Sequence, residues 1–223
     1  MGDLILFAVT PYIAMILAVV VGLYRYFGNR FSYSSISSQF LENRQLFWGS
    51  VPWHYGIILI LLAHVFAAVF PSAVESLLRN TTRLYFMEIS GWILALLSIT
   101  GLTLLIFRRI ISPRVQSVTS VMDWVLLADL LLQIILGFYI AIFYRWGGLW
   151  YIHTVTPWLA SIFRLNPQIN YITPLPLLVK LHIFNGVIVI ALFPFTRLVH
   201  IVTLPITYLW RPYQVVIWNR RGG

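Results

Sequence analysis

Residues 51–70 read VPWHYGIILILLAHVFAAVF, an almost uninterrupted apolar run that contains two histidines, His54 and His64. An α-helix needs roughly 20 consecutive apolar residues to cross the hydrocarbon core of a bilayer, and this run is long enough. Four further stretches pass the same test of length and apolarity: residues 4–24, 85–107, 122–143 and 175–196. The sequence therefore predicts an all-α integral membrane protein, a bundle of five transmembrane helices.

The composition agrees with a protein that faces lipid. Of the 223 residues, 60% are hydrophobic and 9% charged, and the mean hydropathy is +0.87. Soluble domains carry about 25% charged residues, so this chain has too few for a water-facing surface. The net charge of +9 does not indicate a nucleic-acid partner, because the basic residues lie between the apolar runs and form no continuous stripe.

The chain has no cysteine. Disulfides, cysteine-ligated zinc, iron–sulfur clusters held by this chain and c-type haem attachment are therefore excluded. Asp3 and the lack of a basic segment before the first apolar run favour a retained first span over a cleaved signal peptide.

The basic residues between the spans predict the orientation. The positive-inside rule places the more basic side of a membrane protein in the cytoplasm, which here puts the N-terminus outside and the C-terminus inside. Residues 1–206 then form the transmembrane domain, and residues 207–223 form a basic, aromatic cytoplasmic tail, either an interfacial belt or a docking segment. Ten basic residues fall on the inner side: Arg25, Arg30, Arg44, Arg108, Arg109, Arg114, Arg197, Arg211, Arg220 and Arg221. Five fall on the outer side: Arg79, Arg83, Arg145, Arg164 and Lys180.

Four of the five histidines lie in two of the predicted spans, His54 and His64 in the second, and His182 and His200 in the fifth. These spans are antiparallel, so each offers one imidazole at two depths: His64 with His182 near the outer face, and His54 with His200 near the cytoplasmic face. A single histidine near a helix end is more often an interfacial hydrogen-bonding group than a ligand. Two pairs matched in depth, however, predict the axial ligands of two six-coordinate b-type haems. His153 has no counterpart and is expected on the surface.

The spacing of these histidines also predicts a distorted fifth helix. At a rise of about 1.5 Å per residue, His54 and His64 are roughly 15 Å apart, whereas His182 and His200 are roughly 27 Å apart. A strong tilt of the fifth span or a bend at Pro194 must take up the difference. Zinc or non-haem iron is the rival cofactor, but such sites usually gather three or four ligands, often with a carboxylate.

Other polar residues near the spans are candidates for supporting roles. Arg109 and Arg197, at the cytoplasmic ends of the third and fifth spans, could pair with haem propionates, although basic residues are expected there in any case. Glu88, near the outer end of the third span, could accept a proton. Asp129 lies deeper, and a hydrogen bond between helices is the simpler interpretation.

Several motifs resemble one known family. They are PYIA at 11–14, SSQ at 37–39, the interval between His54 and His64, RRIISPR at 108–114, and FPFTRLVHI at 193–201 followed by Pro205, Tyr208, Leu209, Tyr213 and Gln214. With these motifs, most of the chain resembles the gamma (cytochrome b) subunit of membrane-bound respiratory nitrate reductases. Two positions differ from the family's pattern. Ala63 precedes His64 where the best-known members have glycine, and Arg83 is nearest to the place of a lysine associated with the quinol site.

The resemblance implies a subunit of the prokaryotic cytoplasmic membrane that oxidises quinol near the outer face. Its two b haems would pass electrons to a cytoplasmic iron–sulfur subunit and, through it, to a molybdenum catalytic subunit. His64 and His182 would hold the outer haem, and His54 and His200 the inner one. Arg83 and Glu88 are the candidates for contact with quinol. Two alternatives stay open: a cytochrome b subunit of another anaerobic reductase, and a haem-free transporter or assembly factor.

Overall fold

The computed structural model describes residues 1–28, 41, 42, 44–145 and 149–202, and the tail expected at 207–223 lies outside these residues. Five helical stretches in the described part are long and apolar enough to cross a membrane, which confirms the five predicted spans. They are Gly2–Gly28, Arg44–Val69, Thr81–Ile111, Val121–Phe143 and Leu177–Phe195.

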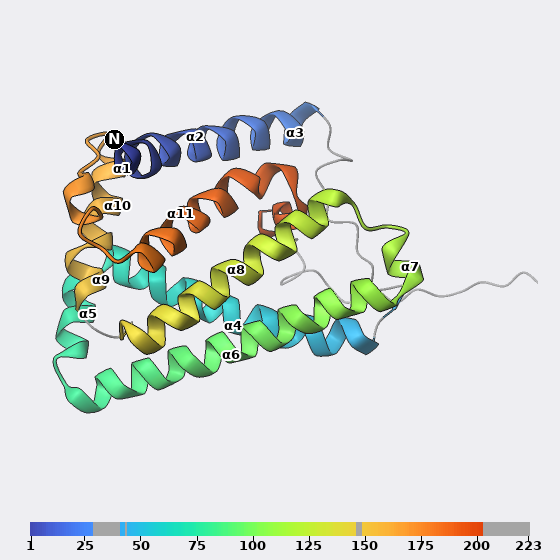
Figure 1. Ribbon diagram of the computed structural model, residues 1–223, viewed down its shortest axis with the longest axis horizontal. Coiled ribbons are helices and arrows are strands. Elements are labelled where there is room, and N and C mark those ends of the chain that lie inside the picture. Colours follow the sequence, from blue (N-terminus) through green and yellow to red (C-terminus); the bar gives the residue numbers. More distant parts are fainter. Residues whose placement is uncertain (29–40, 43, 146–148, 203–223) are drawn as a thin grey trace, which may run out of the picture.

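Each span corresponds to one or more helices in Figure 1. The first is composed of α1 (Gly2–Leu4), α2 (Thr10–Ile16) and α3 (Gly22–Gly28), joined by two π-helical turns. The next four contain α4 (Arg44–Val69), α6 (Thr81–Ile111), α8 (Val121–Phe143) and α11 (Leu177–Leu192). Short helices connect them: α5 (Pro71–Leu78), α7 (Pro113–Gln116), α9 (Trp150–His153) and α10 (Val155–Phe163).

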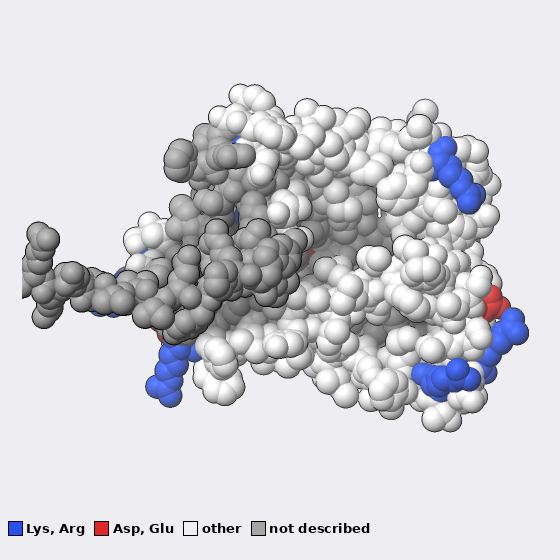
Figure 2. Space-filling model, turned by 180° about the vertical axis from the view of Figure 1, so that it is seen from behind, with Lys and Arg blue, Asp and Glu red and all other residues white. Residues whose placement is uncertain are grey.

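Spans that follow one another in the chain are antiparallel, whereas the first and fifth spans run in the same direction (Figure 1). α4 packs on α6, α6 on α8, α8 on α11, and α11 on α2. We call the end with α5, α9 and α10 the loop end, and the end where α6 finishes and α8 begins the basic end. In Figure 2 the charged side chains of the face shown lie mostly at these two ends, with an uncharged surface between them. This is the distribution that a bilayer requires.

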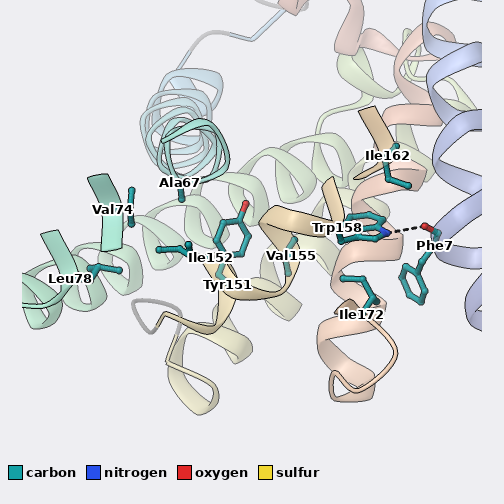
Figure 3. Close-up of a cluster of buried hydrophobic side chains, with 10 residues drawn as sticks. All are labelled: Phe7, Ala67, Val74, Leu78, Tyr151, Ile152, Val155, Trp158, Ile162 and Ile172. Carbon is teal, nitrogen blue, oxygen red and sulfur yellow. Dashed lines mark hydrogen bonds between the residues drawn. The ribbon is translucent and has the colours of Figure 1, made fainter. Parts of the chain in front are cut away.

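The described part of the connection after the fourth span contains two short helices, α9 and α10. α9 and α10 place Tyr151, Ile152, Val155, Trp158 and Ile162 in a buried apolar cluster at the loop end (Figure 3). Residues from the ends of other elements complete this cluster: Phe7, Ala67, Val74, Leu78 and Ile172. Apolar burial therefore fixes this segment against the spans.

Proline chemistry determines one contact of this cluster. Pro11 has no N–H, so the carbonyl of Phe7, four residues earlier, lacks its helical donor. The indole Nε1 of the buried Trp158 donates to that carbonyl at 2.9 Å (Figure 3). The proline of the PYIA motif thus provides an attachment point for α10 on the first span.

Small residues allow α4 and α6 to approach closely. A Cβ atom added to Gly49 would lie 2.8 Å from Leu105, and one added to Gly101 would lie 2.7 Å from the carbonyl oxygen of Gly49. Membrane helices gain packing energy from such close contacts because lipid provides no hydrophobic force between them. The second span is therefore held firmly against the third.

Gly91 and Gly101 both lie in α6, but only Gly101 packs against main-chain atoms of α4. We expect Gly101→Ala to destabilise the folded protein by about 1–3 kcal/mol, because the new methyl group meets main-chain atoms of α4 that cannot move independently. Gly91→Ala is the matched control, since nothing lies within 4 Å of its added Cβ. The measurement is loss of helical circular dichroism on heating in detergent. Equal melting of the two variants would contradict the packing account.

The fifth span is broken where Pro194 predicted a bend. α11 ends at Leu192, a 3₁₀ turn covers Phe193–Phe195, and Thr196 is extended (φ −121°, ψ −179°) before a second 3₁₀ turn, Arg197–Ile201. In Figure 1 this segment turns back beneath α11 rather than continuing along its axis. The distortion required by the unequal histidine intervals is therefore confirmed.

Candidate cofactor site

His54 and His200 face each other, although 146 positions separate them in the chain. Their ring centroids are 6.0 Å apart and the ring planes are inclined by 74°. His54 comes from the first half of α4, and His200 from the 3₁₀ turn after the break in the fifth span. The structure therefore brings together the pair predicted at the basic end.

The other pair lies towards the loop end. His64, in the second half of α4, and His182, in the first half of α11, lie within electrostatic range of each other. Gly137 of α8 leaves space for this ring, because an added Cβ would lie 3.0 Å from the Cε1 atom of His182. Both rings are half-buried.

In each of the four rings, the Nδ1 atom lies within hydrogen-bond distance of a main-chain oxygen. The Nδ1 atoms of His54, His64 and His200 lie 2.7, 2.8 and 2.6 Å from the main-chain oxygens of Ser50, Ile60 and Arg197. The Nδ1 atom of His182 lies 3.1 Å from the oxygen of Gln133. A carbonyl oxygen only accepts, so each Nδ1 carries the hydrogen and each Nε2 carries the lone pair. This is the form in which histidine binds a metal ion.

The residues present fit a metal held between two imidazoles. Histidine nitrogens bind metals at roughly 2 Å, so the centres of two rings on opposite sides of one metal are roughly 6 Å apart. The separation of His54 and His200 has this value. Among residues 1–28, 41, 42, 44–145 and 149–202, no three or more histidine, aspartate or glutamate side chains gather as a metal site. The described side chains therefore offer pairs of imidazoles, which suit a haem with two histidine ligands.

Arg109 and Arg197 both contact the carboxylate of Asp123, a residue that was not among the predicted site residues. Arg197 donates to Asp123 from Nε (2.6 Å) and from Nη2 (3.0 Å), and Arg109 approaches the same carboxylate at 3.5 Å. Asp123 is 4% exposed and lies in the first turn of α8. The one available sequence signal is the Ser120-x-x-Asp123 pattern, which forms a capping box.

At the loop end, Glu88 of α6 is 4% exposed and receives two hydrogen bonds from Arg145, at 2.9 and 3.0 Å. These hydrogen bonds raise the pKa of Arg145, whose guanidinium also lies over the ring of Tyr85. Arg83, by contrast, is exposed on the first turn of α6. Arg83 and Glu88 therefore lie on different sides of the helix.

An apolar pocket lies beside His64, lined by Ala63, Phe66, Ala67, Val74, Leu78, Met87, Tyr151 and Ile152. The Tyr151 ring packs edge-on against the His64 ring with centroids 5.8 Å apart, and its hydroxyl donates to the His64 carbonyl at 3.4 Å. Burial raises the pKa of Tyr151 to about 12, so the phenol keeps its proton at neutral pH. No sequence pattern indicated this tyrosine.

Between α8 and α11, the side chain of Asn185 makes the contacts expected of Asp129. Its Nδ2 donates to the main-chain oxygen of Asp129 at 3.1 Å and to Oε1 of Gln133 at 3.0 Å. The Oδ2 atom of Asp129 is buried and has no hydrogen-bond partner among the described residues. His153, the remaining histidine, is exposed, as predicted.

These observations define a class: an all-α, five-span membrane protein with paired imidazoles between antiparallel helices. The family model for the nitrate reductase gamma subunit matches residues 3–219. The nitrate reductase gamma chain of Bacillus subtilis is 33% identical over the full length of both chains. The respiratory nitrate reductase 1 gamma chain of Escherichia coli is 28% identical, with 96% of each chain covered. The nitrate reductase-like protein NarX of Mycobacterium tuberculosis is 31% identical, with 96% of this chain and 34% of NarX covered.

The chain therefore belongs to the nitrate reductase gamma subunit family. It is a multi-pass membrane subunit of a nitrate reductase, an oxidoreductase, and associates with other subunits of that enzyme. The resemblance seen in the sequence motifs is confirmed, and it favours nitrate reductase over the other anaerobic reductases.

Proposed function

We propose that this subunit is a di-haem cytochrome b that oxidises quinol near the outer face of the membrane and passes the electrons inward. The observation that carries the proposal is the pairing of four imidazoles between α4 and the fifth span at two depths, each with Nδ1 on a main-chain carbonyl. The receiving partners are a cytoplasmic iron–sulfur subunit and, through it, a molybdenum catalytic subunit.

Each ligand has a defined task in this proposal. His64 and His182 hold the haem near the loop end, and His54 and His200 hold the haem near the basic end. Bound haem supplies a one-electron carrier whose potential the protein sets through ligands, hydrogen bonds and burial. Arg109 and Arg197 are partly exposed at the basic end, where guanidinium groups suit the propionates of the second haem.

The quinol site belongs in the apolar pocket beside His64. A quinol is an apolar ring with two hydroxyl groups, and this pocket combines apolar walls with the Tyr151 phenol, while Glu88 follows the lining residue Met87 in the chain. Glu88 takes up a proton as quinol is oxidised, and the exposed Arg83 guides the ring from the loop end. Release of the proton outside and exit of the electron inside make the reaction charge-separating.

The proposed orientation places the loop end outside and the basic end in the cytoplasm. Because the chain contains no cysteine, single replacements can report on the two ends. We expect Ser76→Cys, exposed on α5, to react with a membrane-impermeant maleimide in intact cells. We expect Ser117→Cys, exposed after α7, to react only after the cells are opened. The reverse pattern of labelling would invert the topology.

A visible spectrum of the protein purified from membranes tests the cofactor. The expected result is b-type absorption bands in the reduced state, with two haems per chain by the pyridine haemochrome assay. A colourless preparation would instead favour a haem-free transporter or assembly factor. Co-purification followed by identification of the bound subunits tests the partners, and a reductase other than nitrate reductase would overturn that part of the proposal.

A further inference from the structure

We infer that Asp123 is a positioning residue, which holds the ligand His200 in place by fixing Arg197. The inference rests on the proposed haem function, since its consequence is seen at the haem between His54 and His200. Asp123 touches neither imidazole, and we assign its effect on the His200 ring to the path through the main chain of Arg197.

Asp123 is suited to act as a fixed anchor. It lies in the first turn of α8, where Ser120 Oγ accepts from its N–H at 3.2 Å and its Oδ2 accepts from the Ser120 N–H at 2.9 Å. This reciprocal cap locks the carboxylate to the start of a helix of 23 residues. A carboxylate at 4% exposure needs cationic partners, which Arg197 and Arg109 supply.

Arg197 is held at three points. Its Nε and Nη2 reach the two oxygens of Asp123, at 2.6 and 3.0 Å, and Nη2 also reaches the carbonyl oxygen of Val118 at 2.8 Å. A bidentate arginine–carboxylate pair fixes direction as well as distance. The guanidinium is therefore oriented by α8 and by the turn before it.

The segment that carries His200 depends on such an anchor. The 3₁₀ turn Arg197–Ile201 is short and is separated from α11 by the extended Thr196. Short 3₁₀ turns have poor hydrogen-bond geometry and do not stabilise themselves. The other three ligands differ, because the carbonyl groups of Ser50, Ile60 and Gln133 that orient them belong to long helices.

The carbonyl oxygen of Arg197 links Arg197 to the His200 ring. The carbonyl oxygen of Arg197 lies 2.6 Å from Nδ1 of His200 and sets both the tautomer and the direction of the ring. A shift of Arg197 therefore moves the acceptor and turns the imidazole away from His54. The path runs from the Asp123 carboxylate to the Arg197 guanidinium, and from the Arg197 carbonyl to the His200 ring.

Two conservative variants of the full subunit, purified with its partner subunits, test the path. Asp123→Asn keeps the shape of the side chain but replaces one accepting oxygen with an amide donor. Arg197→Lys keeps the charge but cannot form the two-pronged pair. The readouts are haem content, the low-spin electron paramagnetic resonance signal of each oxidised haem, and the midpoint potential of each.

We expect both variants to shift the signal and potential of the His54–His200 haem and to weaken its retention about 10- to 100-fold, the usual cost of losing an outer-sphere partner. The His64–His182 haem should be unchanged and is the internal control. The double variant should be no worse than the more severe single one, because both break one path. Glu42→Gln is the matched control: it weakens the Arg108–Glu42 pair (2.7 Å) at the basic end and touches no ligand.

If the parent protein holds two haems and both variants leave the signals of the His54–His200 haem unaltered, this inference is wrong and the proposed function still stands. Loss of both haems together, or of the chain from the membrane in both variants, would also overturn it, since Asp123 would then support the bundle and not one ligand. A parent protein without haem would instead defeat the proposed function.

Discussion

Replacing His182 with alanine is expected to remove one haem and leave the other. The His182 ring lies in the space left by Gly137 and is oriented by the carbonyl of Gln133, so no other described imidazole can take its place. Loss of an axial ligand should cost more than the about 10- to 100-fold in metal affinity typical of an outer-sphere partner. The haem content should fall from two per chain to one, and quinol-dependent nitrate reduction should stop.

The remaining haem should keep the spectrum and potential that it has in the unaltered protein, because His54 and His200 lie at the other depth of the bundle. His153→Ala is the matched control, since this histidine is exposed and lies outside both proposed pairs. It should retain both haems and full activity. Loss of both haems in His182→Ala would contradict the pairing by depth, although not the presence of haem.

Glu88→Gln should lower the kcat of quinol oxidation by about 10²- to 10⁴-fold, the usual contribution of a general base. Glutamine keeps the volume of the side chain and one oxygen for Arg145, but it has no carboxylate to take up the quinol proton. Haem content and melting temperature should stay close to those of the parent, because the Arg145 side chain is 54% exposed and water can solvate its charge. Steady-state oxidation of a quinol analogue by the whole enzyme is the measurement.

Glu75→Gln is a suitable control at the same end of the molecule. It removes the charge from an exposed pair with Arg79, where the arginine side chain is 74% exposed, and such pairs contribute little to stability or function. It should leave kcat unchanged. A Glu88→Gln enzyme that works at the parental rate would assign the Glu88–Arg145 pair to structure and remove Glu88 from the proton path.

The spans and the histidine pairs could be predicted because both depend on properties that are local in the sequence. A helix needs about 20 apolar residues to cross a bilayer, however the helices pack. The rise per residue of a helix then gives the depth of each histidine from its position in the span. Even the break near Pro194 followed from the mismatch between two intervals. The family resemblance lay in short motifs such as RRIISPR and FPFTRLVHI.

The partners of the arginines and of Glu88 could not be predicted. Arg197 and Asp123 are 74 positions apart, and Arg145 and Glu88 are 57 apart, so nothing in either local sequence indicates the other. The same holds for Tyr151, which meets His64 only because α9 folds back into the apolar cluster. These contacts place a supporting group next to a proposed ligand or the proposed proton acceptor.

The amino-acid sequence by itself determined that this protein crosses a membrane five times and carries imidazoles at two depths, since hydrophobic length and helical rise act along the chain. Only the tertiary structure decided which carbonyl orients each imidazole, which carboxylate holds Arg197, and where the pocket beside His64 lies. The physical reason is that such contacts join different helices through side-chain packing. Lipid is as apolar as the helix surfaces, so the faces that pack together and the faces that meet lipid have similar sequences.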